Sequence, residues 1–475
     1  MLVLFIATEV APWIKVGGLG DVVGSLPRAL RDLGVDARIC VPAHAGVLAA
    51  APDPTSIARF EVPGASGPLG ASGAEIFETR LGDVPVYLVA GGPIEPDGIV
   101  YTGRIDEEGH RFSFFARAAL ELTRRLERPV DVVHAHDWHA AAIPWLLSRG
   151  GPAAPASVFT VHNLPYAGVG AEPAQRAFGI PGSDDPRLPP HLRGAPMALG
   201  LLGADAITTV SPTYADEITT PEGGHGFDAL LRSRRADLTG ILNGLDVDAW
   251  DPRADRALAA TYSASDRGGR DRCRDALADE LGLPRDVPRI GIVSRLVPQK
   301  GIDVAIAALR GLRRDFAAVI LGAGDPHLEH EARALAADRP DRVRVWVGFD
   351  AGLARRIYAG ADLLLLPSRY EPCGMTQMIA MRYGCVPVAC ETGGLADTVR
   401  DLDLAEQPTG VLFAEPTPRA AAFGLRRALA TRAQKAESWD ALVQNGMTTD
   451  FSWRGSAREY LTTYERARAR RAEVR

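Results

Sequence analysis

The sequence contains very little lysine. Of its 53 basic residues only Lys15, Lys300 and Lys435 are lysines, and all the others are arginine. This bias indicates that arginine fills the ordinary surface positions, so each remaining lysine marks a place where a compact ammonium group is specifically useful. The three lysines are therefore candidate functional positions.

Cysteine is also scarce, and long apolar runs are missing. The five cysteines form no C-x-x-C pair, which excludes a disulfide scaffold and a cysteine zinc site and predicts reduced thiols in the cytoplasm. No run of about 18 apolar residues occurs, so we expect no membrane-spanning helix. The apolar residues 1–7 lead directly to Glu9 and Lys15, which predicts a buried strand rather than a signal peptide. A net charge of -6 argues against a nucleic-acid partner.

Short apolar segments alternate with helical patterns along the 475 residues. At roughly 150 residues per domain, this length predicts about three domains or two large ones. The first half predicts strands at residues 2–7, 37–41, 130–134, 156–161 and 206–210, and helices at residues 22–33 and 112–126. Gly and Pro are frequent between residues 49 and 109, which predicts hairpins and loops there.

The pattern restarts near residue 289. It predicts strands at residues 289–293, 317–321, 343–347, 363–366 and 386–389, with a helix at residues 302–312 after the first of them. Two successive doubly wound halves predict an α/β protein with two Rossmann-like domains, divided near residues 246–252. The last segment, residues 451–475, is a predicted helix whose arginines face solvent: Arg466, Arg468, Arg470 and Arg471.

Three polar motifs follow strands of the first half. Lys15–Asp21 is a glycine-rich turn before a helix, equally typical of an anion site and of a plain tight turn. Residues 134–139, HAHDWH, suit either a metal or sugar hydroxyls, and we favour sugar. His162 follows the next strand. It is either an ordinary loop histidine or a polar side chain that contacts the reacting group of a substrate.

Two motifs follow strands of the second half. Arg295 and Lys300 bracket a turn into a helix, where a diphosphate would meet both cations and free backbone N–H groups. An ordinary surface turn would not explain a lysine in so lysine-poor a chain. Residues 367–377 place Glu371 beside another helix start, which suits sugar or ribose hydroxyls together with phosphate.

Taken together, these motifs closely resemble those of the bacterial glycogen synthases and plant starch synthases. The resemblance covers nearly the whole chain, including KVGGLGD at residue 15, HDWH at 136, VHNL at 161, ILNGLD at 241, QKG at 299, EPCGMTQ at 371 and TGGL at 392. It implies the GT-B fold, two Rossmann-like domains facing across a cleft. The implied domains are residues 1–248 and 249–456, with a final helix, residues 457–475, packing back on the first.

The resemblance implies transfer of glucose to the non-reducing end of an α-1,4-glucan, with retention of configuration. The donor would be ADP-glucose, with UDP-glucose as the second candidate, and no metal or other cofactor is implied. The implied catalytic residues are His162, Arg295, Lys300 and Glu371. The implied donor-binding residues are Lys15, Gly17, Gly18, Phe349, Cys373, Gly374, Met375 and Thr376. The implied contacts to sugar or acceptor are Asp21, Asp137, Asn163 and Asn243.

Four positions depart from the pattern of the family. Ala195 and Ala198 stand where asparagine and lysine are usual, Ala167 replaces a glutamine and Ile379 replaces a tyrosine. The donor motifs are intact, so these changes concern the acceptor. Two alternatives follow, a retaining transferase with a small acceptor and a glucan-binding homologue without activity. The sequence does not predict the oligomeric state.

Overall fold

The chain forms two compact units. The computed structural model describes residues 1–62, 73–151, 153–313 and 315–473. The N-terminal unit comprises Met1–Gly244 and Trp453–Arg475, and the C-terminal unit comprises Leu245–Ser452. The division thus falls slightly before residue 248, and the last segment joins the N-terminal unit from Trp453 onward. Both ends of the chain therefore build the same unit.

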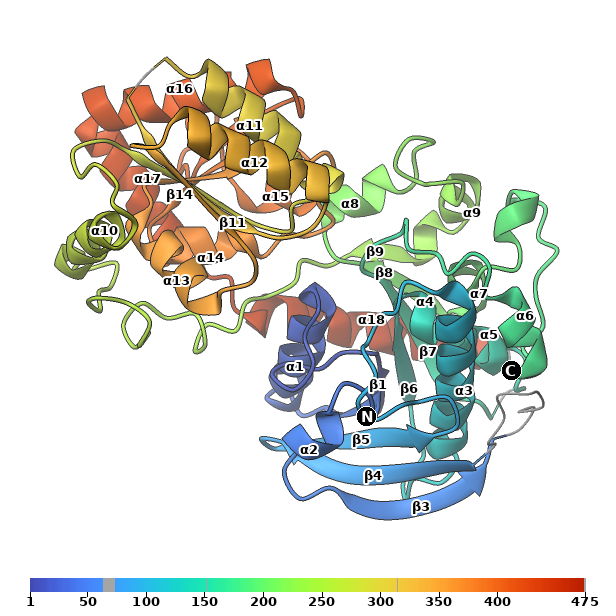
Figure 1. Ribbon diagram of the computed structural model, residues 1–475. Helices are drawn as coiled ribbons and strands as arrows, with labels where there is room; N and C mark the ends of the chain where they lie inside the picture. The colour runs from blue at the N-terminus through green and yellow to red at the C-terminus, as the bar shows by residue number, and fades with distance from the viewer. Residues whose placement is uncertain (63–72, 152, 314, 474–475) are drawn as a thin grey trace. The chain divides into compact units, whose positions relative to one another are not determined.

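The N-terminal unit is built on one sheet with the strand order β3-β4-β5-β2-β1-β6-β7-β8-β9. Neighbours from β5 to β9 are parallel, and β3 and β4 form an antiparallel edge (Figure 1). The strands are β1 (Leu2–Ile6), β2 (Asp36–Pro42), β3 (Thr55–Glu61), β4 (Gly73–Leu81), β5 (Val84–Gly91), β6 (Val132–His136), β7 (Ala156–Val161), β8 (Ala206–Thr209) and β9 (Leu238–Gly240).

Helices cover both faces of this sheet. In Figure 1, α1 and α18 lie on one face and α3, α4 and α5 on the other. The helices of this unit are α1 (Gly18–Arg31), α2 (Val47–Ala50), α3 (Ile105–Thr123), α4 (Asp137–Ala140), α5 (Ala142–Ser148), α6 (Glu172–Ala177), α7 (Pro196–Gly203), α8 (Pro212–Glu217), α9 (Asp228–Ser233) and α18 (Trp453–Glu473).

Some elements differ from their predicted bounds. Helix α1 begins at Gly18 rather than at residue 22, so the second half of the predicted glycine-rich turn is its first helical turn. The segment predicted as hairpins and loops forms β3, β4 and β5, whose antiparallel pairs confirm the hairpins. In addition β5 pairs in parallel with β2 and so extends the central sheet, which was not predicted. Residues 63–72 of that segment lie outside the described residues. Helix α3 begins at Ile105 rather than at residue 112, because its first turn carries three acidic side chains that suit a helix N-terminus.

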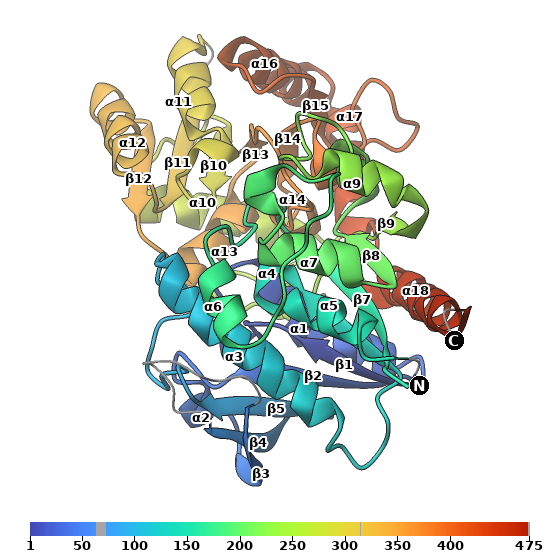
Figure 2. The ribbon, with the colours of Figure 1, turned by 90° about the vertical axis from the view of Figure 1, so that its right-hand side faces the viewer.

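The C-terminal unit is a fully parallel sheet with the order β12-β11-β10-β13-β14-β15. Its strands are β10 (Arg289–Val293), β11 (Ala317–Gly322), β12 (Val343–Val347), β13 (Leu363–Leu366), β14 (Val386–Cys390) and β15 (Val411–Phe413). Its helices are α10 (Gly268–Leu281), α11 (Ile302–Gly311), α12 (Pro326–Asp338), α13 (Ala351–Gly360), α14 (Thr376–Arg382), α15 (Gly393–Thr398), α16 (Pro418–Gln434) and α17 (Ala436–Thr448). Helices α11, α12 and α16 lie on one face and α10, α13 and α14 on the other (Figure 2).

Burial explains why the strands were readable from the sequence. Every residue of β1 and of β13 is buried, which is typical of strands that helices cover on both faces. Helix α1 instead buries a stripe at helical spacing, Leu19, Val22, Val23, Leu26 and Leu30. Each sheet thus lies in the middle of a three-layer unit.

Helix α18 is more deeply embedded than its arginine-rich sequence predicts. Arg471 is buried, and its guanidinium donates to Oδ2 of Asp205 from Nε at 3.1 Å and from Nη2 at 2.8 Å. Arg470 pairs with Asp237, and Arg468 pairs with Asp131 at 3.3 Å. The prediction of a solvated face is therefore wrong for Arg471, because its guanidinium is buried and pairs with the carboxylate of Asp205.

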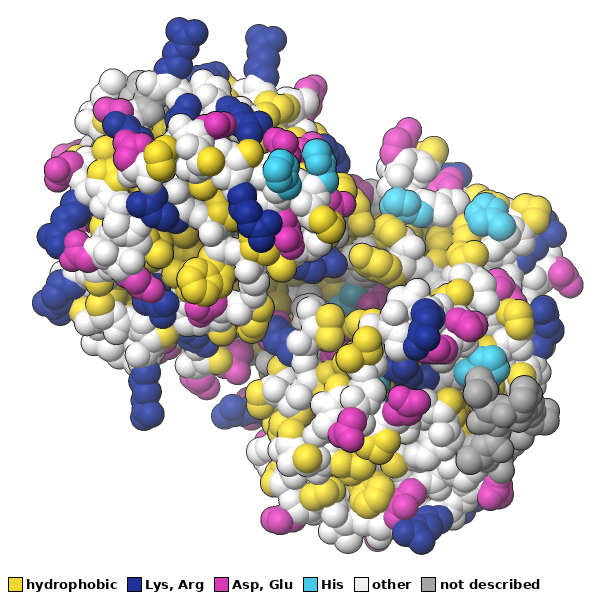
Figure 3. Space-filling model, viewed as in Figure 1, with side chains coloured by type: hydrophobic (Ala, Val, Ile, Leu, Met, Phe, Trp, Pro, Cys, Tyr) yellow, Lys and Arg dark blue, Asp and Glu magenta, His cyan; other side chains and the backbone are white. Residues whose placement is uncertain are grey.

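The surface carries mixed charge. Basic and acidic side chains are interspersed over the face of each unit that Figure 3 shows. Many of them pair, as Arg342 does with Asp315 at 2.7 Å and Arg356 with Glu280 at 2.8 Å. Among the described residues, none of the helices combines the length and the apolar character that crossing a membrane requires.

Candidate active site

The strand order of each sheet indicates where a ligand binds. In the N-terminal unit β1 lies between β2 and β6, and in the C-terminal unit β10 lies between β11 and β13. The order reverses at these strands, and ligands of open parallel sheets bind beyond the carboxyl ends of strands at such a reversal. The loops after β1, β6, β10 and β13 are therefore the candidate site segments, and they contain most of the predicted residues.

In the C-terminal unit, the loops after β10 and β13 bring Lys300 and Glu371 together. The Nζ atom of Lys300 lies 2.5 Å from Oε2 of Glu371, and the Ser368 hydroxyl donates to the same oxygen at 3.0 Å. Glu371 is 7% exposed. Gly301, with φ +64°, packs so closely that a Cβ there would overlap the carbonyl oxygen of Pro367. Two predicted catalytic residues thus form one ion pair at the reversal point.

Arg295 belongs to the same loop but stays at the surface. Its Nη2 donates to Oε1 of Gln299 at 3.3 Å, and Gln299 Nε2 donates to the carbonyl of Tyr370 at 3.3 Å. The guanidinium is exposed. The loop therefore offers an exposed cation beside the half-buried ammonium of Lys300.

The segment from Cys373 to Thr376 leads into α14 and is held by Gln377. The Nε2 atom of Gln377 donates to the carbonyls of Cys373 at 3.1 Å and Gly374 at 2.7 Å, and to Thr398 Oγ1 at 2.9 Å. The sequence motif contained this glutamine but suggested no role for it. The structure shows that it fixes the backbone beside Glu371.

The space around the Lys300–Glu371 pair is almost filled. The pocket that these two residues line with Ser368, Thr376 and Gln377 holds about 10 Å³. That is close to the minimum for a single water molecule. This enclosed space is too small to hold a phosphate or a sugar, whereas the Lys300 side chain is partly exposed to solvent.

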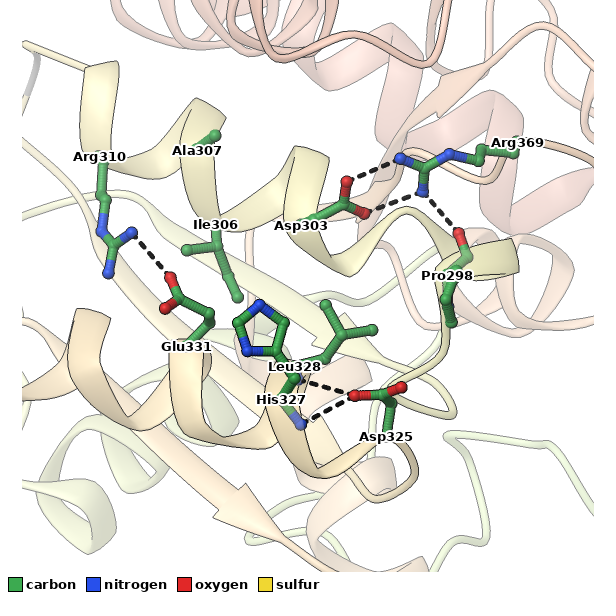
Figure 4. A pocket seen from close by; sticks show the side chains of 10 residues that line it. All are labelled: Pro298, Asp303, Ile306, Ala307, Arg310, Asp325, His327, Leu328, Glu331 and Arg369. Atoms are coloured by element: carbon green, nitrogen blue, oxygen red, sulfur yellow. Dashed lines mark hydrogen bonds and ion pairs between the residues drawn. The ribbon is translucent and has the colours of Figure 1, made fainter.

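A larger pocket of about 470 Å³ lies between α11 and α12. Figure 4 shows Arg369 with Asp303 at one end and Arg310 with Glu331 at the other. Arg369 also donates to the carbonyl of Pro298 at 2.6 Å, and its backbone N–H donates to the carbonyl of Gln299 at 2.8 Å. Arg369 thereby ties the loop after β13 to the turn that carries Lys300.

Phe349 stands free at the surface after β12. Its side chain is 93% exposed, and Gly348 before it has φ +146°. Burying so large an apolar ring against a flat partner is favourable, so this position suits stacking on an aromatic ligand.

In the N-terminal unit, the loop after β1 exposes Lys15 and Gly17 and Gly18. The Lys15 ammonium pairs with Asp21 Oδ1 at 2.8 Å, and 45% of the lysine side chain is exposed. The buried carboxylate of Glu9 accepts from the backbone N–H groups of Val16 at 2.7 Å and Gly17 at 2.9 Å. Sequence reasoning treated Glu9 only as a charge near the N-terminus, although an acid so soon after a buried strand was the available signal.

The loops after β6 and β7 meet at Asp137. Its Oδ1 accepts from the backbone N–H of His162 at 2.8 Å and of Asn163 at 3.4 Å, and its φ is +53°. Burial raises the pKa of Asp137 to about 7, against the lowering effect of these two hydrogen bonds. Asp137 is predicted to bind sugar hydroxyls, and one of its two carboxylate oxygens is therefore already used to hold the backbone of the His162 loop.

Several buried polar atoms of this unit have no hydrogen-bond partner among the described residues. They include Oδ1 of Asn163, Oδ1 of Asn243 and Nδ1 of His139. A buried acceptor or donor left unpaired costs roughly 1–3 kcal/mol. Such atoms are suited to hydroxyl groups of a ligand, which can donate and accept.

The histidines of the segment HAHDWH have different roles, and two of them, His134 and His136, lie within β6 rather than after it. His134 is fully buried and bonds to Tyr464 Oη at 2.9 Å and to Thr160 Oγ1 at 2.6 Å, so it links the sheet to α18 rather than contacting a sugar. Nδ1 of His136 lies 2.9 Å from Nε2 of His162. Burial lowers the pKa of His162 to about 3, which keeps this imidazole neutral. No group of three or more His, Cys, Asp or Glu that could hold a metal ion occurs among the described residues.

Buried neutral histidines make the stability of this unit depend on pH. Burial lowers the pKa of His44 to about 4, and its Nε2 donates to the Thr8 carbonyl at 2.9 Å. Below the unfolded value of roughly 6.5, the unfolded chain binds the extra proton first, so the free energy of unfolding falls as pH falls from about 6.5 to about 4. We expect His44→Gln to remove about 2 kcal/mol of the decrease between pH 7 and pH 5, measured by urea unfolding. His327→Gln, at an exposed histidine, is the control, and equal pH slopes in both variants would contradict the assignment.

The four departures from the family pattern are all buried. Ala195 and Ala198 have no exposed surface at the start of α7, and Ala167 and Ile379 are each 6% exposed. In this structure these four side chains therefore contribute to interior packing rather than to an exposed surface.

Two family models cover most of the chain. Residues 2–233 match the starch synthase catalytic domain, and residues 274–446 match the glycosyl transferases group 1. With the two Rossmann-like sheets, these matches define a glycosyltransferase of the GT-B fold. A glycogen synthase of Anaeromyxobacter dehalogenans (strain 2CP-C) is 44% identical over 480 residues, which covers 98% of this chain and 99% of the relative. The chain belongs to the family of glycogen and starch synthases.

Solved structures agree with this assignment. The catalytic domain of starch synthase IV from Arabidopsis thaliana, bound to ADP and acarbose, matches with a TM-score of 0.89 and 34% identity, over 98% of this chain and 99% of that one. Sucrose-phosphate synthase from Thermosynechococcus elongatus shares the fold, with a TM-score of 0.61 and 18% identity over 98% of this chain and 99% of that one.

Proposed function

We propose that the protein transfers glucose from ADP-glucose to the non-reducing end of an α-1,4-glucan, with retention of configuration. The observation that carries the proposal is the Lys300–Glu371 pair at the reversal point of the C-terminal sheet, with exposed Arg295 on the same loop. Two cations and a carboxylate match a donor with a diphosphate beside a polyhydroxyl sugar. The starch synthase IV structure, which holds ADP and acarbose, supports the same substrate classes.

The donor diphosphate is assigned to Arg295 and Lys300. Negative charge grows on this leaving group as the bond to glucose breaks, and preorganised cations stabilise it. The Lys300 ammonium has three N–H donors, so it can donate to the diphosphate as well as to Glu371, and Glu371 is assigned to the glucose hydroxyls. The backbone of Cys373, Gly374, Met375 and Thr376, held by Gln377, is assigned to the glucose and its phosphate.

The N-terminal unit is assigned the remaining contacts. Lys15, Gly17 and Gly18 are proposed to contact the donor, and Asp21, Asp137, Asn163 and Asn243 the sugar hydroxyls. The unpaired Oδ1 atoms of Asn163 and Asn243 support this role, because each gains a hydrogen bond from a hydroxyl. The backbone carbonyl of His162 is assigned to the positive charge at the reacting carbon, in a loop that Asp137 shapes.

The step itself is proposed to occur on one face of the sugar. The acceptor hydroxyl attacks the anomeric carbon as the bond to the donor phosphate breaks, and a phosphate oxygen of the leaving group takes the hydroxyl proton. Glu371 is paired with Lys300 and Asp137 with backbone N–H groups, which suits binding better than covalent attack. A glucosyl-enzyme adduct trapped by mass spectrometry would contradict this step.

Product analysis tests the function. The protein is incubated with ADP-glucose or UDP-glucose and maltooligosaccharides, and the products are sized. We expect chains that grow by single glucose units, faster with ADP-glucose. Transfer to small acceptors alone would favour the alternative transferase, and the absence of transfer from either donor would refute the proposal. A cytoplasmic location is part of this proposal, which the five free, buried cysteines support.

Phe349→Ala tests the nucleobase position. Stacking of a base on an aromatic ring contributes about 1–3 kcal/mol, so the dissociation constant for ADP should rise roughly 5- to 150-fold in titration calorimetry. The fold should be unaffected because the ring is 93% exposed. Phe423→Ala removes another exposed phenylalanine, on α16, and should leave ADP binding unchanged. Equal affinities of the two variants would contradict the stacking role.

A further inference from the structure

Glu9 is a buried carboxylate whose two oxygens are both engaged within the protein. It lies between β1 and the glycine-rich loop and is 2% exposed. Its Oε2 accepts from the backbone N–H groups of Val16 and Gly17, and its Oε1 accepts from the Tyr101 hydroxyl at 2.7 Å. A buried carboxylate that accepts three hydrogen bonds is held firmly in one position and can anchor the backbone around it.

The backbone conformation of the glycine-rich loop depends on Glu9. The loop is closed below by backbone bonds between Val10 and Ile14, at 3.0 and 2.9 Å, and between Ala11 and Gly20, at 3.0 Å. Between those anchors Lys15, Val16 and Gly17 are exposed. Glu9 reaches into the loop from beneath and holds two consecutive amides. The backbone next to Lys15 is therefore set by the length of the Glu9 side chain.

Tyr101 holds Glu9 in turn. Its hydroxyl also bonds to Thr8 Oγ1 at 2.9 Å, and its ring lies 5.0 Å from the ring of His139 in α4. Burial raises the pKa of Tyr101, so the phenol stays protonated and donates to Glu9. The loop after β1 is thereby connected to the segment after β6, where the His162 loop is also anchored.

We propose that Glu9 is a positioning residue for glucosyl transfer. Glu9 positions the Lys15 ammonium by fixing the backbone of residues 15–17. Its own carboxylate does not contact the substrate. The inference rests on the proposed function, since Lys15 is assigned to the donor there. A displacement of about 1 Å at such a group costs on the order of 10²-fold in rate.

Two substitutions separate side-chain length from charge. Glu9→Gln keeps the length, so its carbonyl oxygen can still accept from Val16 and Gly17 while its amide donates to Tyr101. Glu9→Asp keeps the charge but is one methylene too short to reach both amides. We expect Glu9→Asp to lower kcat about 10²-fold and Glu9→Gln to retain at least ten times more turnover than Glu9→Asp. The reverse order would show that the charge matters, and it would overturn the proposal.

Two further readouts make the test independent of overall stability. Hydrogen exchange should be faster at the amides of Val16 and Gly17 in Glu9→Asp than in Glu9→Gln, with the remaining amides unchanged. Combined with Lys15→Ala, Glu9→Asp should add little further loss of kcat. Lys15→Ala removes the ammonium and Glu9→Asp displaces it, so the two changes abolish the same contact. Additive losses would contradict an action through Lys15.

The outcome also distinguishes this proposal from the proposed function. If the unaltered protein transfers no glucose, the function is refuted, and the exchange of the two amides still reports whether Glu9 anchors the loop. If the protein transfers glucose and the two amides exchange equally in both variants, the anchor is refuted and the function stands.

Discussion

Replacing Lys300 with alanine is expected to lower kcat for glucosyl transfer about 10²–10³-fold, the usual loss when one preorganised partner of a developing charge is removed. Lys300 lies in the loop after β10, where it pairs with Glu371, and in the proposed reaction its ammonium donates to the leaving diphosphate. Steady-state kinetics with ADP-glucose and a glucan measure the effect. Thermal unfolding checks that the variant remains folded.

The chain contains a matched control for this substitution. Lys435 is an exposed lysine at the joint between α16 and α17, and Lys435→Ala should leave kcat unchanged. Lys300→Arg should also lose most of the activity, because the broader guanidinium does not reproduce the ammonium at a packed pocket of about 10 Å³. A near-normal rate for Lys300→Ala would contradict the assigned role.

Arg471→Ala is expected to lower the free energy of unfolding of the N-terminal unit by about 3–5 kcal/mol. Arg471 and Asp205 are 7% and 9% exposed at their side chains, and removing one partner of a buried pair leaves the other charge uncompensated. Asp205 keeps its hydrogen bonds from the backbone and the hydroxyl of Ser157, which compensate its charge only in part. Denaturant unfolding followed by circular dichroism measures the change.

Arg468→Ala is the control for Arg471→Ala. Arg468 lies on the same helix as Arg471 and pairs with Asp131, which precedes β6. Because 49% of the Arg468 side chain is exposed, this pair is expected to contribute about 0–1 kcal/mol. If both variants lost the same small amount of stability, α18 would be held by its apolar face alone, and the role given to the buried pair would be wrong.

The fold was predictable wherever local pattern and burial coincide. Strands such as Leu363–Leu366 are continuously apolar because helices cover both faces, and they are bounded by loops that the sequence marks clearly. The edge of the N-terminal sheet was harder. Strand β5 belongs to the central sheet only through its parallel pairing with β2, which no local pattern reveals.

The candidate site was partly predictable for a similar reason. Lys300 and Glu371 follow different strands, and the reversal of strand order brings those loops together. The sequence did not reveal that they form an ion pair, because this depends on the packing of Gly301 against Pro367. Glu9 and His134 were misjudged because their partners Tyr101 and Tyr464 are distant in the sequence.

The joining of α18 to the N-terminal unit has a consequence for synthesis. Tyr464 and Arg471, the partners of His134 and Asp205, are translated after the whole C-terminal unit. The first unit to leave the ribosome is therefore the last to be completed, and until then its sheet lacks the helix that covers β6, β7 and β8. A chain that ends at Ser452 has the full sequence of the second unit, while its first unit lacks α18 and exposes a partly uncovered core.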